Sequence, residues 1–222
     1  MARPATDLRQ RILTAARQAF AARGVDATPL RAIAKTAGTT IGMVYYYYPS
    51  KDDLYFAVVE EVYARVLQQF AAVMTPAGEG PTPSFRDRLR TLMRHLAELS
   101  AEDRQVVAIV LREVTVSTAR RQRLQERFSR GHIPLVMSAV LRAQAAGELR
   151  ADLHPAMLVF ATAALSAMST LLLEHAPLPG LPRGEARIEA TLELLFSGLT
   201  GAAAPPSAAT AAAADAPPGR GA

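Results

Sequence analysis

The chain has 222 residues, half of them hydrophobic, with a net charge of +5 and no cysteine. This hydrophobic content excludes disorder throughout the chain, and the lack of cysteine excludes disulfides, thiol catalysis and cysteine-ligated zinc and fits a reducing, cytoplasmic location. Alanine is abundant whereas β-branched and aromatic residues are sparse, so we predict an all-α fold of about nine helices.

The N-terminal part begins with two predicted helices. Apolar residues recur at helical spacing over residues 7–23, and Gly24 then ends this helix. Thr28 and Pro29 are expected to be the N-cap and first position of a second, shorter helix, which Gly38 ends. Basic residues outnumber acidic ones over the first 60 residues, which is compatible with a nucleic-acid partner.

A run of four tyrosines, Tyr45 to Tyr48, distinguishes the next two predicted helices. The hydroxyl of Thr40 can cap the helix that carries them, and Ser50 can cap the following helix, which continues to about residue 70. Successive helical residues differ in direction by about 100°, so the four rings cannot share one environment. Tyr48 and Val44 are predicted to face inward. The alternative is that the tyrosines merely fill a helical core.

The remainder is predicted to contain five helices separated by loops rich in glycine and proline. Their ranges are 84–99, 103–117, 119–146, 155–175 and 185–199. Gly131 and Pro134 should kink the third of them near residues 130–134. Residues 201–222 are almost wholly Ala, Pro, Gly, Ser and Thr and are predicted to be a disordered tail.

One uncharged run, residues 155–173, is long enough to cross a bilayer. It is only mildly apolar, however, because it contains many alanines and hydroxyl residues, and no aromatic belt flanks it. We therefore expect a helix buried between other helices rather than a membrane span, and no membrane partner.

Two short helices joined through residues 38–40 form a helix-turn-helix, with its motif at about residues 29–48. The spaced residues of 28–34 and 42–54, including the tyrosine run and the Pro49-Ser50-Lys51 that follows it, make residues 8–60 resemble the tetracycline-repressor (TetR) family of bacterial transcription regulators. The resemblance implies a DNA-binding domain over residues 1–54 and an effector-binding and dimerisation domain over residues 55–200.

The resemblance also implies which residues face DNA. Those expected to face mainly phosphates are Thr28, Thr40, Tyr45, Tyr46, Tyr47 and Lys51, whereas Gly42 and Met43 would face base edges, with Arg31, Thr39 and Ile41 as further candidates. The reading helix lacks Arg, Lys, Asn and Gln, which make bidentate contacts with bases. We therefore expect modest direct readout, supplemented by apolar contacts with thymine methyl groups and by DNA shape.

The partners implied are a double-stranded, palindromic DNA operator, a second copy of the chain and a small, largely apolar effector. The small residues of 155–175 and the apolar stripe of 185–199 suit a dimeric four-helix bundle, although packing within one subunit accounts for part of each. The candidate effector residues are Met93, Arg94, His95, Ile109, Arg112, Glu113, Met137, Phe160 and Met168.

The function favoured is therefore a repressor that an effector releases from its operator. The alternatives are a TetR-like activator and a helical protein that binds a small ligand without controlling DNA. No phosphate-binding loop, metal-ligand spacing or nucleophile motif favours an enzyme, so we expect no catalytic residue, no metal site and no cofactor.

Overall fold

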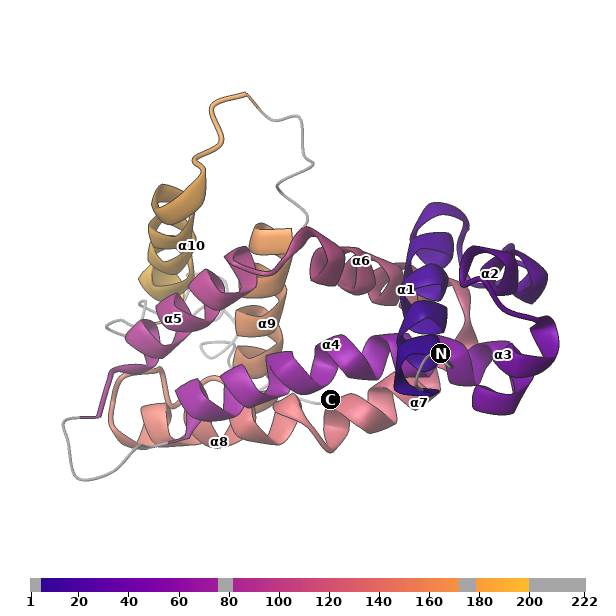
Figure 1. The fold of residues 1–222 in the computed structure, drawn as a ribbon. Coiled ribbons are helices and arrows are strands. Elements are labelled where there is room, and N and C mark those ends of the chain that lie inside the picture. The colour runs from indigo at the N-terminus through magenta and orange to yellow at the C-terminus, as the bar shows by residue number, and fades with distance from the viewer. Residues whose placement is uncertain (1–4, 76–81, 172–178, 200–222) are drawn as a thin grey trace, which may run out of the picture.

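The computed structural model describes residues 5–75, 82–171 and 179–199, and every regular element in these ranges is an α-helix (Figure 1). The helices are α1 (Ala5–Arg23), α2 (Leu30–Thr36), α3 (Ile41–Tyr47), α4 (Lys51–Met74), α5 (Phe85–Ala97), α6 (Ala101–Val116), α7 (Thr118–Ser129), α8 (His132–Ala145), α9 (Pro155–Leu171) and α10 (Gly184–Leu199). The all-α prediction is confirmed, with ten helices in the described ranges. The predicted tail, residues 201–222, lies outside them.

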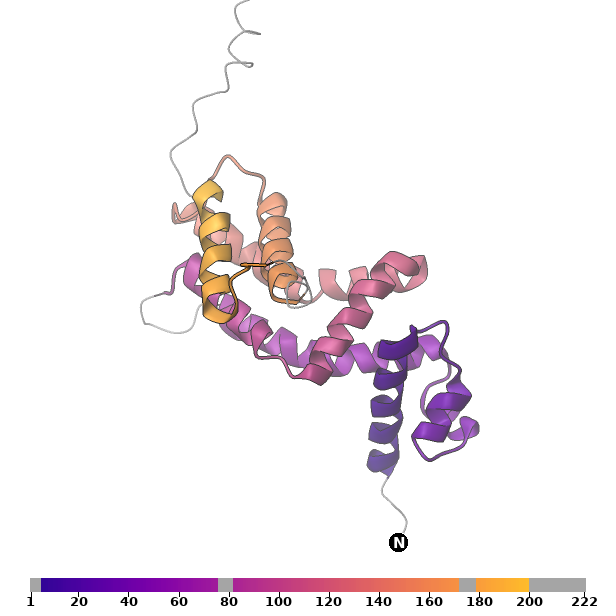
Figure 2. The same cartoon turned by 90° about the horizontal axis from the view of Figure 1, so that it is seen from above.

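The longest helix, α4, connects two separate hydrophobic cores. Its N-terminal part belongs to a core that it shares with α1, α2 and α3 and with buried residues of α6 and α7, whereas its C-terminal end belongs to a core formed mainly by α5, α8, α9 and α10. Figure 2 shows the same division, with α1–α3 at one end of the molecule and α9 and α10 at the other. The helix runs through the predicted domain boundary at residue 54 without a break, and that boundary stays a prediction.

Local capping chemistry defines the helices around the turn. The hydroxyl of Thr40 accepts a hydrogen bond from the backbone N–H of Met43 at 3.3 Å, and that of Ser50 accepts one from Asp53 at 3.0 Å. Both predicted N-caps are confirmed. Gly24 and Gly38 follow α1 and α2 with φ of 88° and 63°, the left-handed region in which glycine is favoured.

The predicted cap at Thr28 is wrong. The N-cap of α2 is Pro29, which makes no side-chain capping bond, and the helix begins at Leu30. The Thr28 hydroxyl is fully buried and donates instead to the carbonyl oxygens of Gly24, at 2.6 Å, and Ala19, at 3.2 Å. It therefore fastens the segment before α2 to the end of α1.

The predicted single helix over residues 119–146 is two helices. Gly131 separates α7 from α8 with a non-helical backbone (φ −109°, ψ −109°). A Cβ atom there would lie 2.1 Å from the Tyr63 hydroxyl oxygen, so the close approach of α4 requires glycine at the break. Pro134 falls in the first turn of α8, where its missing N–H removes no helical bond.

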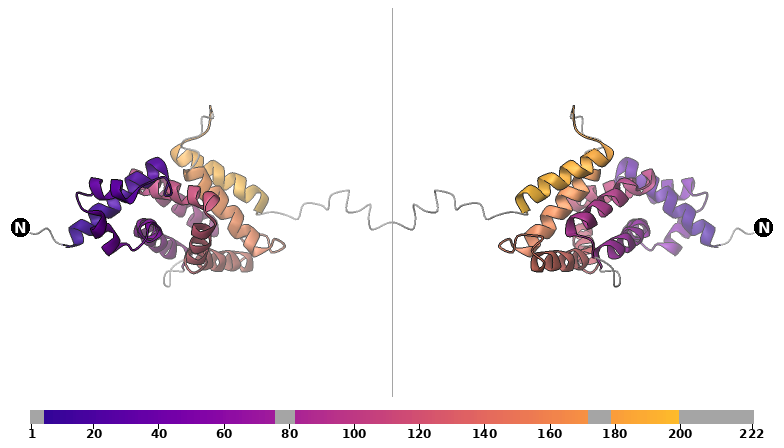
Figure 3. Two further views of the ribbon diagram at one scale, coloured as in Figure 1. Left: turned by 90° about the vertical axis from the view of Figure 1, so that its right-hand side faces the viewer. Right: turned by 90° about the vertical axis from the view of Figure 1, so that its left-hand side faces the viewer.

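The last two helices pack against each other (Figure 3). The predicted apolar stripe of α10 is buried within the subunit at Ile188, Leu192, Leu195 and Phe196, so intrasubunit packing explains these positions. Leu194, Met157 and Phe160 are the exposed large apolar residues of α9 and α10 among the side chains that the structure describes. Within the described residues, no helix combines the length and hydropathy that a bilayer crossing needs.

Candidate nucleic-acid interface and ligand cavity

The inner face of α2 and α3 is fixed by packing. Leu30, Ile33 and Val44 are buried in the core shared with α1 and α4. The turn between the helices is also held, because a guanidinium N–H of Arg11 on α1 donates to the carbonyl oxygen of Ala37 at 2.9 Å. The second helix of the motif is thereby presented as a rigid element at the end of the molecule (Figure 1).

The tyrosine run divides by direction, as helical geometry predicts. Tyr45 and Tyr46 are 49% and 77% exposed, Tyr47 is half-buried and packs edge-on against Tyr46, and Tyr48 is only 4% exposed. Burial raises the pKa of the Tyr48 hydroxyl, and the charge of Arg9 opposes this shift. Tyr45 and Tyr46 thus lie on the outer face of α3, Tyr47 lies at its edge and packs partly against the core, and Tyr48 belongs to the core.

The other outward positions of α3 form a continuous surface with these rings. Thr40 and Gly42 are exposed, and Ile41 and Met43 are half-buried. A Cβ atom at Gly42 would meet only the Thr40 hydroxyl oxygen, at 3.8 Å, and the backbone of Gly42 has a negative φ. Internal packing and backbone conformation therefore do not require glycine at this position.

Three further predicted DNA contacts lie around this surface, and a fourth, Thr28, does not. Arg31 is exposed on α2, and Thr39 is half-buried in the turn. Lys51, at the start of α4, donates one ammonium hydrogen bond to the carbonyl oxygen of Asp26 at 2.9 Å, which leaves its other two donors for an anion. Thr28 is the exception, because its buried hydroxyl is used inside the subunit. We therefore remove Thr28 from the candidate interface.

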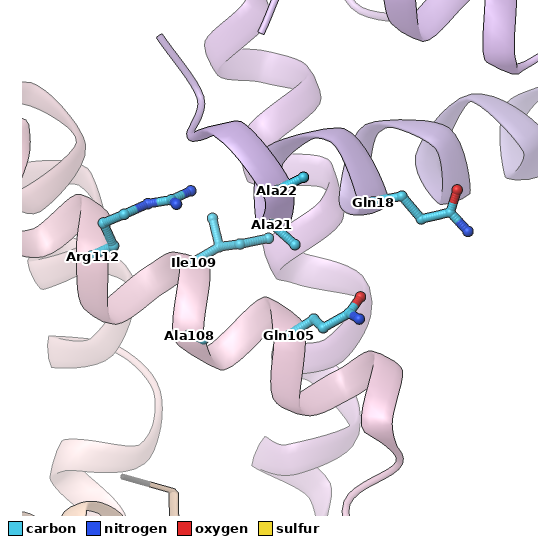
Figure 4. A pocket seen from close by; sticks show the side chains of 7 residues that line it. All are labelled: Gln18, Ala21, Ala22, Gln105, Ala108, Ile109 and Arg112. Carbon is cyan, nitrogen blue, oxygen red and sulfur yellow. The ribbon is translucent and has the colours of Figure 1, made fainter. Parts of the chain in front are cut away.

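The predicted effector residues are not brought together in one cavity. Met137 and Phe160 line a cavity between α4, α5, α8 and α9, whereas Ile109 and Arg112 line a different pocket between α1 and α6. Figure 4 shows this second pocket, which polar Gln18 and Gln105 border from opposite helices. Arg112 also donates to the carbonyl oxygen of Phe20 at 2.5 Å, so it fastens α6 to the end of α1.

The remaining predicted effector residues have structural partners or lie elsewhere. Met93 is buried in the second core, and Glu113 in an ion pair described below. Arg94 pairs with Glu185 on α10. His95 is half-buried, and the side chain of Met168 is outside those that the structure describes.

Two apolar cavities lie along α4 and adjoin each other. The first, of about 300 Å³, lies between α4, α6 and α7 and is lined by valine, leucine and aromatic side chains. The second, of about 410 Å³, extends to α9. Phe70, Leu96 and His132 line both. This is the most extensive apolar lining among the described pockets, and its volume is in the range of small-molecule sites.

A tyrosine and a histidine meet where the two cavities adjoin. The hydroxyl oxygen of Tyr63 lies 2.9 Å from Nδ1 of His132 and accepts a hydrogen bond from the backbone N–H of His132 at 3.2 Å. The imidazole is surrounded by the rings of Tyr63, Phe70 and Phe128. Burial, assisted by the charge of Arg127, lowers the pKa of His132 below its ordinary value of 6.5.

This pKa shift predicts a pH dependence of stability. Because the folded state favours neutral His132, its contribution is complete above the unfolded pKa of about 6.5 and is lost as the pH falls through the lower folded pKa. We expect His132→Gln to remove this part of the decline in the free energy of unfolding. Urea denaturation from about pH 8 to 5 measures it, and parallel curves for the two proteins would contradict it.

Arg120 joins the N-terminal module to the C-terminal half. Its guanidinium contacts Glu113 at 2.6 Å, Asp26 at 2.5 Å and Asp52 at 2.9 Å. The Glu113–Arg120 pair is buried, and Glu113 also lies 3.5 Å from the backbone N–H of Val25. Burial alone would lower the pKa of Arg120, but the hydrogen bonds to its three carboxylates raise it. The same contact holds the pKa of Asp26 below its usual range.

Two more arginines of α7 also form ion pairs with carboxylates of α4. Arg123 lies 3.5 Å from Asp53 and over the Phe56 ring. Arg127 pairs with Glu60 at 2.7 Å and lies over the ring of Tyr63. We call Arg120, Arg123 and Arg127 the arginine ladder. Its spacing of three and four residues was a signal of one helix face that the sequence interpretation did not use.

Comparisons with known proteins identify the N-terminal module. Residues 12–58 match the family model described as "Bacterial regulatory proteins, tetR family". A sequence search of curated proteins finds no significant match.

Solved structures match over nearly the whole chain. Salmonella enterica GusR is 24% identical with a TM-score of 0.67, covering 89% of this chain and 98% of that one. Bacillus subtilis FadR in complex with stearoyl-CoA is 18% identical with a TM-score of 0.65, and AibR in complex with isovaleryl coenzyme A and operator DNA is 21% identical with a TM-score of 0.65. Both of the latter cover 85% of this chain and 98% of theirs. At these identities the structural likeness shows the fold.

Proposed function

We propose that this chain, whose N-terminal module matches the tetR-family model over residues 12–58, is a transcription regulator, and specifically a dimeric repressor that a small apolar effector releases from its operator. The observation that carries the proposal is the pairing, in one chain, of an outward-facing helix of the helix-turn-helix with an apolar cavity behind it. The helix α4 contacts both.

The DNA contacts follow from the exposed surface of α3. Thr40, Tyr45, Tyr46 and Tyr47 offer hydroxyls to phosphates, and Lys51 adds its charge at the start of α4. Ile41, Gly42 and Met43 lie toward the floor of the major groove, with Arg31 and Thr39 at its rim. Because these floor residues offer no bidentate side chain, shape and thymine methyl groups carry much of the specificity.

Dimerisation is proposed through α9 and α10. Met157, Phe160 and Leu194 are large apolar side chains that remain exposed on these helices. Covering them with a second copy places the two modules on opposite sides of a twofold axis. Such a dimer would read a palindromic operator whose half-sites are about 34–36 Å apart.

The effector is proposed to occupy the two adjoining cavities. Their lining is apolar, so the ligand's buried part is apolar as well. The complexes of FadR with stearoyl-CoA and AibR with isovaleryl coenzyme A are ligand-bound proteins of the same fold. They support a ligand that brings a hydrocarbon chain into the helical half.

Gly42→Ala tests the DNA face without weakening the fold. Alanine is a better helix former than glycine, so the free energy of unfolding should rise by about 0.5–1 kcal/mol. The added methyl group should weaken operator binding several-fold, because it separates α3 from the groove. An operator obtained by selection from random DNA allows both quantities to be measured, by fluorescence anisotropy and urea denaturation.

Gln68→Ala provides the control, since Gln68 is exposed on α4 away from this surface. It should leave operator affinity unchanged. If the folded Gly42→Ala variant binds the operator with wild-type affinity, the proposed placement of α3 in the groove is contradicted. Failure of the selection to enrich any sequence would refute sequence-specific binding.

A further inference from the structure

The polar atoms at the junction of the cavities fix the protonation of His132. The Tyr63 hydroxyl oxygen already accepts from the backbone N–H of His132, and its own proton needs an acceptor. Nδ1 of His132, at 2.9 Å, provides one. The other tautomer would aim two donors at the Tyr63 oxygen and leave the tyrosine proton without an acceptor among the described residues. In the neutral imidazole, Nε2 therefore carries the hydrogen.

The Nε2 edge of the His132 ring is the edge that remains free to contact a ligand in the cavities. Tyr63 holds the Nδ1 edge, and no described residue accepts a hydrogen bond from Nε2. The ring lines both cavities. Gly131 secures this arrangement, because a side chain there would collide with the Tyr63 hydroxyl. The junction thus offers one directed donor in a largely apolar surrounding.

Such a donor selects the ligand's chemistry. An apolar ligand would displace water from this half-buried N–H and leave it unpaired, so the site favours a ligand that places an oxygen acceptor against it. The cavities on either side of His132 are mainly apolar, so the parts of the ligand that flank this oxygen inside the cavities are apolar too. A ketone or ester between two hydrocarbon arms satisfies both conditions. A coenzyme A thioester fits these conditions less well, because one of the two arms next to its carbonyl is polar.

We propose that His132 reads a carbonyl oxygen near the middle of the effector through Nε2–H, with Tyr63 as the positioning residue that sets the tautomer. The inference rests on the proposed ligand-binding role of the cavities. It assigns the effector to neutral ketones or esters with a hydrocarbon arm on each side of the carbonyl.

Two matched probes test this assignment. Dihexyl ketone carries the central oxygen, and its analogue with a methylidene group in place of that oxygen has the same arms without an acceptor. Their affinities are measured by displacement of the neutral dye N-phenylnaphthylamine from the full chain. The quantity compared is the ketone preference of each protein, which is the dissociation constant of the alkene divided by that of the ketone.

His132→Phe keeps an aromatic ring but removes the donor, and it should lower the ketone preference about fivefold or more. His132→Gln, which retains an amide N–H, should preserve more of that preference than His132→Phe. An equal preference in wild type and His132→Phe would refute the inference while leaving the ligand cavity intact. If the dye and both probes fail to bind the folded wild type, the proposed ligand cavity fails together with the inference.

The tautomer has its own readout. A long-range proton–nitrogen correlation spectrum of the free protein should show His132 neutral with its proton on Nε2. Tyr63→Phe should shift His132 toward the Nδ1-protonated form and reduce the ketone preference. A wild-type spectrum showing the Nδ1 tautomer or an imidazolium would overturn the assignment.

Discussion

Replacing Arg120 with methionine is expected to lower the free energy of unfolding by about 3–5 kcal/mol, because the buried carboxylate of Glu113 then loses its closest cationic partner and its only one on a buried side chain. Glu113 is only 2% exposed, and its closest cationic contact is Arg120 at 2.6 Å; Arg112 lies 3.7 Å away. Asp26 and Asp52 are much more exposed, so losing their contacts should add little. Urea denaturation of the full chain measures the change.

Two further variants separate burial of the charge from loss of a contact. Adding Glu113→Gln to Arg120→Met removes the unpaired charge and should recover a large part of the lost stability. Arg123→Met, which removes an exposed member of the arginine ladder, should cost about 0–1 kcal/mol. If the double variant is as unstable as Arg120→Met alone, the buried charge is not the cause.

Phe20→Ala is the second variant with a large expected effect, about 3–5 kcal/mol of destabilisation. The Phe20 side chain is fully buried and packs edge-on against Tyr55 on α4, with ring centroids 6.5 Å apart. Removing this side chain leaves a cavity in the first core. The backbone carbonyl of the same residue accepts the hydrogen bond by which Arg112 fastens α6 to α1. Chemical denaturation provides the measurement, and a change below about 1 kcal/mol would contradict the packing described.

Tyr55→Phe is the matched control in the same core. Burial raises the pKa of the Tyr55 hydroxyl, and this hydroxyl has no hydrogen-bond partner among the described residues. Removing it should therefore change the unfolding free energy by less than about 1 kcal/mol, or stabilise the fold. A loss comparable to that of Phe20→Ala would show that the hydroxyl is paired.

The sequence predicted features whose causes are local. Thr40 and Ser50 cap helices because their partners lie three residues away in the chain, and Tyr48 turns inward because of helical geometry alone. Thr28 was misassigned because its hydroxyl bonds to Ala19 and Gly24 across the end of α1. Whether the Thr28 hydroxyl caps α2 or bonds to the end of α1 depends on how the two helices pack.

The ligand cavity depended on contacts between distant segments. Tyr63 and His132 are 69 positions apart, and only the crossing of α4 by the start of α8 brings them together. The same crossing explains why Gly131 breaks the helix rather than kinking it. Apolar periodicity identified the helices but could not distinguish a cavity wall from core. The predicted effector residues were consequently spread over two pockets and the interior.

Ionic strength should act on this molecule at two places, the proposed DNA interface and the arginine ladder. Salt is expected to weaken the proposed operator binding directly, because phosphate contacts release counterions. It also screens the partly exposed pairs of Arg123 and Arg127 with α4, and so loosens the support behind the reading helix. The salt slope of operator affinity should therefore be steeper than the phosphate contacts alone would give, and the slope of a ladder variant would separate the two contributions.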